Sequence, residues 1–178
     1  MKGKFIVFEG GEGAGKDTQI DLLKKKLPAG KVIYTREPGG TDLGKELRSL
    51  LLNSTHTIDD SAEAFMFLAD RAQHMAEVVQ PSLEKGIHVI ANRSWMSLIA
   101  YQIYGRQQEF LLPLVELAHE TIYRKKTPDL VLFLDIEPEA GLARKKALGE
   151  MNTIDRAPIE FHKRVQKGFY ASLEKAKN

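Results

Sequence analysis

The feature that most constrains the fold of this chain is a glycine-rich segment near its start, GGEGAGKDT at residues 10–18. It follows a short apolar run at residues 5–8 and precedes an amphipathic stretch, so a buried strand, a tight turn and a helix are predicted in succession. Glycines let consecutive backbone N–H groups converge on an anion, and the N-terminus of the next helix adds partial positive charge there. The segment therefore predicts a loop that binds the phosphates of a nucleotide.

Within this loop, Lys16 is placed to reach the β- and γ-phosphates. The next position, where a Ser or Thr usually ligates Mg²⁺, is Asp17, whose carboxylate is also a hard oxygen ligand. Thr18 offers a hydroxyl as a second candidate, and Glu9 follows the first strand, where it can organise water around the metal. The predicted phosphate-binding residues are Gly10, Gly11, Glu12, Gly13, Ala14, Gly15, Lys16, Asp17 and Thr18, and the candidate metal ligands are Asp17, Thr18 and Glu9.

The rest of the chain alternates short apolar runs with amphipathic segments, a pattern typical of βαβ units around a parallel sheet. We expect a single α/β domain over residues 1–178, because no repeat or linker divides the sequence. Strands are predicted at residues 5–8, 32–34, 87–91 and 130–134. Helices are predicted at 16–27, 41–52, 60–79, 95–104 and 109–123, after residue 138 and from 158 onward.

Composition excludes several other classes of protein. Lys and Arg number 26 against 24 Asp and Glu, a balance that argues against a nucleic-acid-binding surface. The absence of cysteine excludes disulfides and thiolate metal sites, and the five histidines show no metal-ligand spacing, so we interpret them as structural. No apolar run approaches the ~20 residues of a membrane span, and the start does not resemble a signal peptide. We therefore expect a soluble, cytoplasmic protein that binds neither membranes nor nucleic acids.

Five further segments make the sequence more specific: TREPGGT at 35–41, LRSLL at 47–51, MFLADR at 66–71, NRSWMSLIAYQ at 92–102 and PDLVLFLD at 128–135. Together with the phosphate loop they resemble the thymidylate kinases, in the order of that family and over about residues 4–170. The resemblance implies a three-layer α/β fold of the P-loop NTPase type. It also implies transfer of the γ-phosphate of ATP to dTMP, with Mg²⁺, and a homodimer formed through the faces of helices 2, 3 and 6.

The resemblance also implies roles for particular residues. Phe67 would stack on the thymine base, and Arg71, four residues later on the same helix face, would reach the base edge. Arg93, at the end of a predicted strand, would clamp a phosphate. Ser97 and Tyr101 would face the base and the sugar together, with the tyrosine favouring deoxyribose. The expected substrate-binding residues are Glu37, Arg48, Phe67, Arg71, Arg93, Ser97, Tyr101 and Gln102.

A basic segment at about residues 144–157 corresponds to the lid of kinases in this family. A mobile lid excludes water and adds positive charge to the transition state. Leu148 and Thr153 stand where basic residues are often found, so which side chain acts is left open. The expected catalytic residues are Lys16, Arg93, Arg144 and Arg156.

Two departures from the family pattern leave alternatives open. The chain has Asn92 where the family usually has Asp, and we hypothesise that Asp17 compensates for the lost carboxylate. The family usually continues with a fifth strand and a helix, and the loop between them helps to cradle adenine, so from this sequence we expect four strands and weaker discrimination between ATP and GTP. One alternative is a deoxynucleoside kinase, whose motif Arg93 and Ser94 resemble; the other is a nucleotide-binding protein that has lost catalysis.

Overall fold

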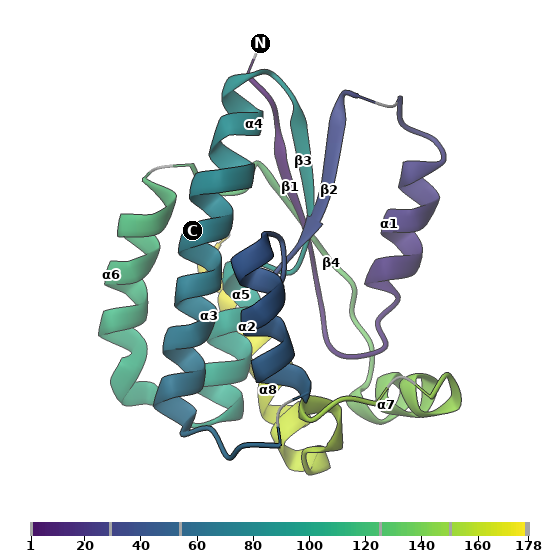
Figure 1. The fold of residues 1–178 in the computed structure, drawn as a ribbon. Helices are drawn as coiled ribbons and strands as arrows, with labels where there is room; N and C mark the ends of the chain where they lie inside the picture. Colours follow the sequence, from purple (N-terminus) through teal and green to yellow (C-terminus); the bar gives the residue numbers. More distant parts are fainter. Residues whose placement is uncertain (1, 29, 54, 125, 150, 177–178) are drawn as a thin grey trace.

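The computed structural model describes residues 2–28, 30–53, 55–124, 126–149 and 151–176; the predicted domain and lid each include residues outside these ranges. Strands and helices alternate in the first two thirds of the described chain, as the sequence predicts (Figure 1). The elements are β1 (Phe5–Glu9), α1 (Lys16–Lys24), β2 (Val32–Arg36), α2 (Asp42–Asn53), α3 (Asp60–His74), η1 (Met75–Val79), α4 (Gln80–Glu84), β3 (His88–Asn92), α5 (Trp95–Leu98), η2 (Ile99–Gly105), η3 (Glu109–Leu111), α6 (Leu112–Tyr123), β4 (Leu130–Phe133), α7 (Pro138–Ala147), η4 (Ile154–Arg156) and α8 (Ile159–Lys175).

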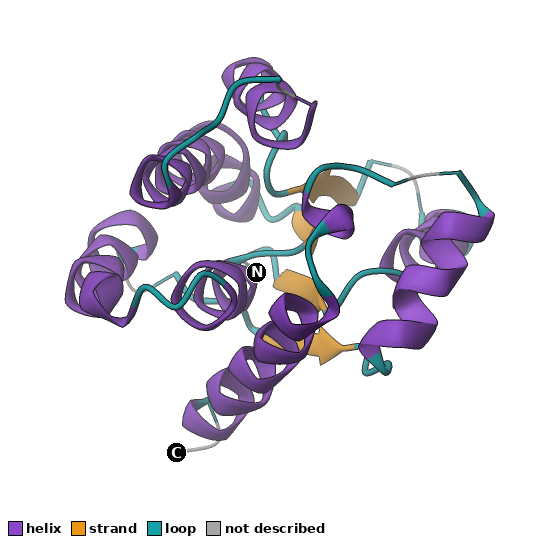
Figure 2. Ribbon diagram, turned by 90° about the horizontal axis from the view of Figure 1, so that it is seen from below, coloured by secondary structure: helices purple, strands orange, loops and turns teal. Residues whose placement is uncertain are grey.

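The four strands form one parallel sheet in the order β2-β3-β1-β4, which confirms the α/β fold predicted from the sequence. Helix α1 lies on one face of this sheet, and α3, α4 and α6 lie on the other (Figure 1). Seen along the other axis, helices flank the strands on both sides (Figure 2). Parallel strands covered on both faces must be apolar on both faces, as the strand at residues 5–8 is.

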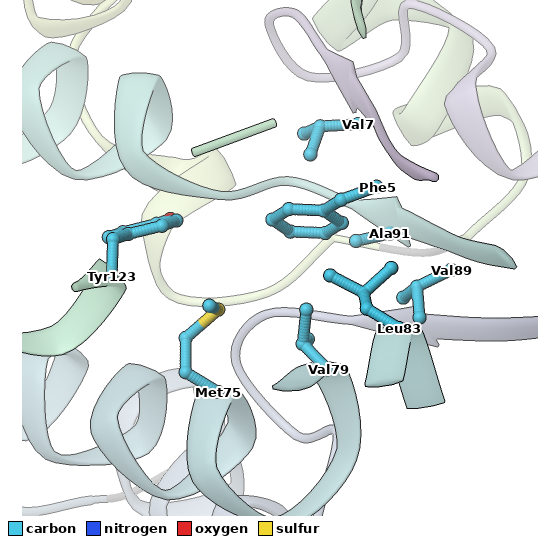
Figure 3. Packing of buried hydrophobic residues seen from close by; sticks show 8 residues of the cluster. All are labelled: Phe5, Val7, Met75, Val79, Leu83, Val89, Ala91 and Tyr123. Atoms are coloured by element: carbon cyan, nitrogen blue, oxygen red, sulfur yellow. The ribbon is translucent and has the colours of Figure 1, made fainter. Parts of the chain in front are cut away.

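The central strands alternate their side chains between two cores. Phe5 and Val7 of β1 point toward Met75 and Val79, in a cluster of fully or nearly fully buried side chains (Figure 3). Phe8, next along the strand, points to the opposite face and packs in the cluster that contains Ile20 of α1. This alternation follows from the period of two in a strand, and it holds β1 between the two helical layers.

Several predicted boundaries are corrected by the structure. Helix α1 ends at Lys24, three residues before the predicted end, because the chain tightens into turns in which Lys26 and Leu27 donate to the Leu23 carbonyl. The helix predicted at 60–79 does begin at Asp60, and Asp59, just before it, caps it by accepting from the N–H groups of Ser61 and Ala62.

Two long helical segments contain π-helical turns that periodicity did not predict. The segment that begins with α3 runs on through η1 into α4, and α5 continues directly into η2. Turns of this kind are frequent at functional sites, and η2 carries Tyr101 and Gln102. Among the described helices, none is both long enough and apolar enough to cross a membrane.

Candidate active site

The carboxyl ends of the parallel strands meet at one edge of the sheet, where ligands gather in folds of this type. A cavity of about 880 Å³ opens there. It is lined by residues of the phosphate loop, the ends of β2 and β3, helices α2, α3 and α7, and the α5–η2 segment. The predicted residues that line it are Glu12, Gly13, Ala14, Gly15, Lys16, Asp17, Thr18, Glu37, Arg48, Phe67, Arg71, Arg93, Ser97, Tyr101, Gln102 and Arg144.

The phosphate loop is tightly held at its base. Gly13 has a φ of 66°, and a Cβ there would lie 2.1 Å from the Gly141 carbonyl oxygen, so only glycine fits. The buried Lys16 ammonium donates to the carbonyl oxygens of Gly10, at 2.9 Å, and Gly11, at 2.7 Å. Burial, reinforced by the neighbouring Arg93 charge, lowers the pKa of Lys16 to about 7. Gly10 and Gly11 thus serve the site through their carbonyl groups and do not line the cavity.

Glu12 stands at the centre of a polar cluster that joins this loop to β3 and η2. Its Oε1 accepts from Arg93 Nη2 at 2.6 Å and from the Tyr101 hydroxyl at 2.7 Å. Burial opposes ionisation of Glu12, yet the charges of Arg93 and Lys16 hold its pKa below the usual range. Arg93 has a φ of 71°, a strained conformation for a residue with a side chain, at the carboxyl end of β3. Its guanidinium lies between the loop and η2 and donates to Glu12 and to the Tyr101 hydroxyl.

At the other end of the cavity, two buried polar atoms have no hydrogen-bond partner. Arg71 donates through Nε to Glu37 at 2.6 Å and through Nη2 to the Ser94 carbonyl at 2.8 Å, which leaves Nη1 unpaired. Gln102 donates through Nε2 to Glu63 at 2.7 Å, which leaves Oε1 unpaired. Unpaired buried polar atoms are costly, and Phe67 lines the cavity with both residues. This end is therefore suited to a flat ligand with a polar edge.

Glu37 organises this end of the site from β2's carboxyl side. Its Oε1 lies 2.8 Å from Nδ1 of His74, and His74 Nε2 lies 2.8 Å from the Thr35 hydroxyl. All charges here are buried, and the Arg71 guanidinium holds the pKa of Glu37 below its usual range despite that burial. The sequence placed Glu37 and Arg71 in the site but did not predict that they pair, since they lie 34 residues apart.

At the predicted metal site, Asp17 and Asn92 are in contact. Asn92 Nδ2 donates to Asp17 Oδ1 at 2.9 Å, and Asn92 Oδ1 is buried without a partner. Arg36 Nη2 pairs with the same Asp17 oxygen at 2.5 Å. Glu9 does not line the cavity, because its buried carboxylate accepts from Ser94 and Ser97. Within the described ranges, no three His, Asp or Glu side chains form a metal-binding group.

Only some residues of the predicted lid line the cavity. Arg144 lines the cavity, with Nη1 3.5 Å from the Gly13 carbonyl oxygen, and Arg48 lines it while donating to the Pro38 carbonyl at 3.0 Å. Arg156, at the end of the η4 turn, is exposed and does not line the cavity, unlike the other three residues predicted to be catalytic. Lys145 lines the cavity, whereas the exposed Lys146 does not.

Sequence reasoning missed two cavity residues of clear chemical interest, Arg36 and Lys145. Arg36 ends β2, and a charged residue at the carboxyl end of a predicted parallel strand is a signal that could have found it. Lys145 belongs to a basic run in which no local pattern distinguishes one side chain from the next. Its place became evident only when α7 was packed against the phosphate loop.

A strand–loop–helix phosphate site that faces an arginine-lined cavity, in a parallel α/β sheet, defines a nucleotide-dependent phosphotransferase. The family model for thymidylate kinase matches residues 8–178. The chain belongs to the thymidylate kinase family, and its activity is the phosphotransferase activity of that family, which uses ATP.

Relatives and a solved structure agree with this family. A thymidylate kinase of Carboxydothermus hydrogenoformans is 46% identical over 171 residues, which cover 95% of this chain and 83% of the relative. One of Trichodesmium erythraeum is 44% identical over an alignment of 199 residues, and the match covers 100% of this chain and 85% of the relative. The crystal structure of thymidylate kinase from Ehrlichia chaffeensis matches with a TM-score of 0.77 at 28% identity, over 98% of this chain and 89% of the other.

Proposed function

We propose that this chain transfers the γ-phosphate of ATP to dTMP, giving dTDP and ADP. The observation that carries the proposal is that one cavity joins the phosphate loop to the unpaired atoms of Arg71 and Gln102 beside Phe67. A nucleoside monophosphate can therefore lie with its base at one end and its phosphate near Arg93. Phosphoryl transfer needs mainly positioning and neutralisation of charge, which Lys16 and Arg93 supply.

The unpaired atoms favour thymine over cytosine. Thymine presents a carbonyl acceptor at O4 beside an N–H donor at N3, and cytosine presents the reverse pattern. Arg71 Nη1 supplies a donor and Gln102 Oε1 supplies an acceptor. Glu63 fixes the direction of the Gln102 amide, because a carboxylate accepts only from the amide nitrogen, and Arg106 holds Glu63 in turn at 2.8 Å. A cytosine base would leave buried groups unpaired and be rejected.

The metal end has a donor set that suits Mg²⁺. Magnesium in such sites is held by one or two protein oxygen ligands together with substrate phosphates, and not by an all-protein cage. Asp17 and Thr18 would hold it, and the unpaired Asn92 Oδ1 offers a third oxygen next to Asp17. When bound, the ion supplies positive charge that offsets the phosphates. Asn92 and Arg36 both hydrogen-bond Oδ1 of Asp17, which restricts the orientation of this carboxylate.

We also propose that the chain forms a homodimer through α2, α3 and α6. These three helices expose large apolar side chains that the described chain leaves uncovered: Leu43, Leu50, Phe65, Leu114 and Leu117. Large exposed apolar side chains on neighbouring helices are typical of an interface with another protein chain.

The proposed function is tested by measuring ADP release with ATP and a panel of acceptors, with and without Mg²⁺. The panel contains dTMP, dUMP, dCMP, the ribose form of TMP, and thymidine. We expect Mg²⁺-dependent turnover that is fastest with dTMP, because the base and phosphate ends of the cavity must both be filled. Faster turnover of thymidine than of dTMP would instead support a deoxynucleoside kinase. Nucleotide binding without ADP release would support a binding protein that has lost catalysis.

A further inference from the structure

Helix α7 places one face against the phosphate loop. A Cβ on Gly141 would lie 2.0 Å from the Glu12 carbonyl oxygen, so the two backbones are in direct contact. Residues three and four positions later share that face of a helix. Arg144 accordingly approaches Gly13, and the Lys145 ammonium lies 3.3 Å from Glu12 Oε2. Lys145 is therefore directed at the phosphate loop by the geometry of its own helix.

A second carboxylate holds Lys145 from the side of the predicted lid. Its Nζ lies 2.6 Å from Asp155 Oδ2, and the Asp155 side chain is 0% exposed. The same oxygen accepts from the Asn152 N–H at 2.8 Å, and Asn152 Oδ1 accepts from the Asp155 N–H at 3.1 Å. Residues 152–155 thus form a closed turn around one end of the ion pair. The Lys145 side chain is only 16% exposed, which makes this pair less subject to solvent screening than a surface salt bridge.

We propose that Lys145 is the cation of the lid that contacts the transferred phosphate, and that Asp155 is its positioning residue. The proposal rests on the phosphoryl transfer proposed above. Glu12 already has a shorter ion pair, with Arg93 at 2.6 Å, so Lys145 can exchange its 3.3 Å contact for a phosphate oxygen and keep Asp155. A lysine suits this exchange because its ammonium is a point charge on a flexible stem.

The side chains at other positions of the lid explain why Lys145 takes this role. Leu148 and Thr153 carry no charge, and Arg156 lies outside the cavity lining. Arg144 lines the cavity but is exposed, and its described hydrogen bond is a 3.5 Å contact to a backbone oxygen. Lys145 alone among these positions is described with a close ionic contact to the phosphate loop.

The test compares Lys145→Met with Lys145→Arg and with Lys146→Met, a matched control on the same helix that does not line the cavity. Turnover and KM are measured for ATP and dTMP, and binding is measured for ADP and for ADP with aluminium fluoride and dTMP, which mimics the phosphate in transfer. Removing one charge donor from such a transition state lowers kcat by about 100-fold. We expect that loss in Lys145→Met, with both KM values within roughly threefold of wild type.

Further outcomes separate a direct role from a structural one. Lys145→Met should weaken binding of the fluoride complex by about the same factor as kcat while leaving ADP affinity unchanged. Lys145→Arg should recover most of the turnover, and Asp155→Asn should add little to the loss in Lys145→Met. Equal turnover in Lys145→Met and Lys146→Met, with an active wild type, would overturn the role of Lys145 alone. A wild type that releases no ADP with dTMP would overturn both proposals.

Discussion

Glu12 is the residue on which three parts of the site converge. It belongs to the phosphate loop, and its carboxylate contacts Arg93 from β3's end, Tyr101 from η2 and Lys145 from α7. Because a buried carboxylate without partners is very unfavourable, these contacts fix the relative position of loop, strand end and helix. The residue that sequence reading treated as one member of a glycine-rich loop is thus the centre of the polar network.

A prediction at the residue scale concerns the hypothesis that Asp17 compensates for the carboxylate that is absent at Asn92. Asn92→Asp would place two carboxylates where Asn92 Nδ2 now donates to Asp17 at 2.9 Å, and their repulsion should lower Mg²⁺-dependent turnover. Adding Asp17→Ser should restore much of the loss, with a coupling free energy of about 1–3 kcal/mol. The measurement is a double-mutant cycle on kcat/KM across magnesium concentrations. Effects of the two substitutions that simply add would contradict the compensation.

A second prediction at this scale concerns protonation of Lys16. Its pKa of about 7 means that it is partly neutral in the free protein at neutral pH, whereas nucleotide phosphates favour the ammonium and raise that pKa. Between the pKa of Lys16 in the free protein and its higher pKa with nucleotide bound, the complex holds more protons than the free protein. Binding should therefore weaken as pH rises above about 7.

Calorimetry of ADP binding at pH 8, in two buffers of different ionisation enthalpy, measures this proton uptake. The Lys16→Arg protein provides the control, because arginine stays protonated in both states. Heats that do not depend on the buffer in the wild type would show that Lys16 is already fully charged before nucleotide binds.

At the scale of elements, the contact between α7 and the phosphate loop links the predicted lid to the nucleotide site. Gly13 and Gly141 each leave no room for a side chain against the backbone of the other segment. Both α7 and the loop lie beyond the same end of the sheet, although they are far apart in the sequence (Figure 1). Movement of the loop on binding phosphate would therefore be transmitted to the helix that carries Arg144 and Lys145.

Gly141→Ala tests this contact. Alanine is the better helix former by about 1 kcal/mol, so a helix free of the loop would be stabilised by the substitution. We expect the opposite, a loss of about 1–3 kcal/mol from overpacking against the Glu12 carbonyl, together with reduced turnover. Thermal or denaturant unfolding measures the change. Gly11→Ala serves as the control for stability only, because a Cβ at residue 11 has no neighbour within 4 Å. A Gly141→Ala protein that is as stable as wild type would contradict the proposed contact.

At the scale of the whole molecule, the helical layer formed by α3, η1, α4 and α6 both supports the site and carries the proposed dimer surface. Its inner side packs on β1 and β3 through side chains such as Met75 and Val79 (Figure 3). Its outer side exposes apolar residues of α3 and α6. Because Phe67 and Arg71 of α3 line the cavity, association at this face would constrain the helix that binds the acceptor base.

Leu117→Glu tests the dimer. Leu117 is 61% exposed on α6, so a glutamate there should not disturb the fold but should place a charge in the proposed interface. We expect the wild type to have the mass of a dimer and the variant that of a monomer, measured by light scattering after size exclusion. Leu22→Glu on α1, at the opposite face of the sheet, is the control and should remain dimeric. A monomeric wild type would exclude the proposed interface.

The order of strands and helices and the phosphate loop were predictable from the sequence because they depend on short-range constraints, whereas most of the other predicted cavity residues followed from the resemblance to the thymidylate kinases. Glycines at residues 10–15, an apolar run before them and an amphipathic stretch after them specify a strand, a turn and a helix locally. The exact helix ends were less predictable: α1 ends at Lys24, three residues before the predicted end, because the chain then forms turns in which Lys26 and Leu27 donate to the Leu23 carbonyl.

The pairing of distant side chains was decided only by the tertiary structure. Arg71 meets Glu37 across 34 residues, and Lys145 meets Glu12 across 133. No local pattern encodes such contacts, because they depend on how helices pack on the sheet and on how much water that packing removes. For the same reason the sequence did not distinguish Arg144 from Arg156, whereas packing of α7 and η4 brought Arg144 and Lys145 to the cavity and left Arg156 exposed.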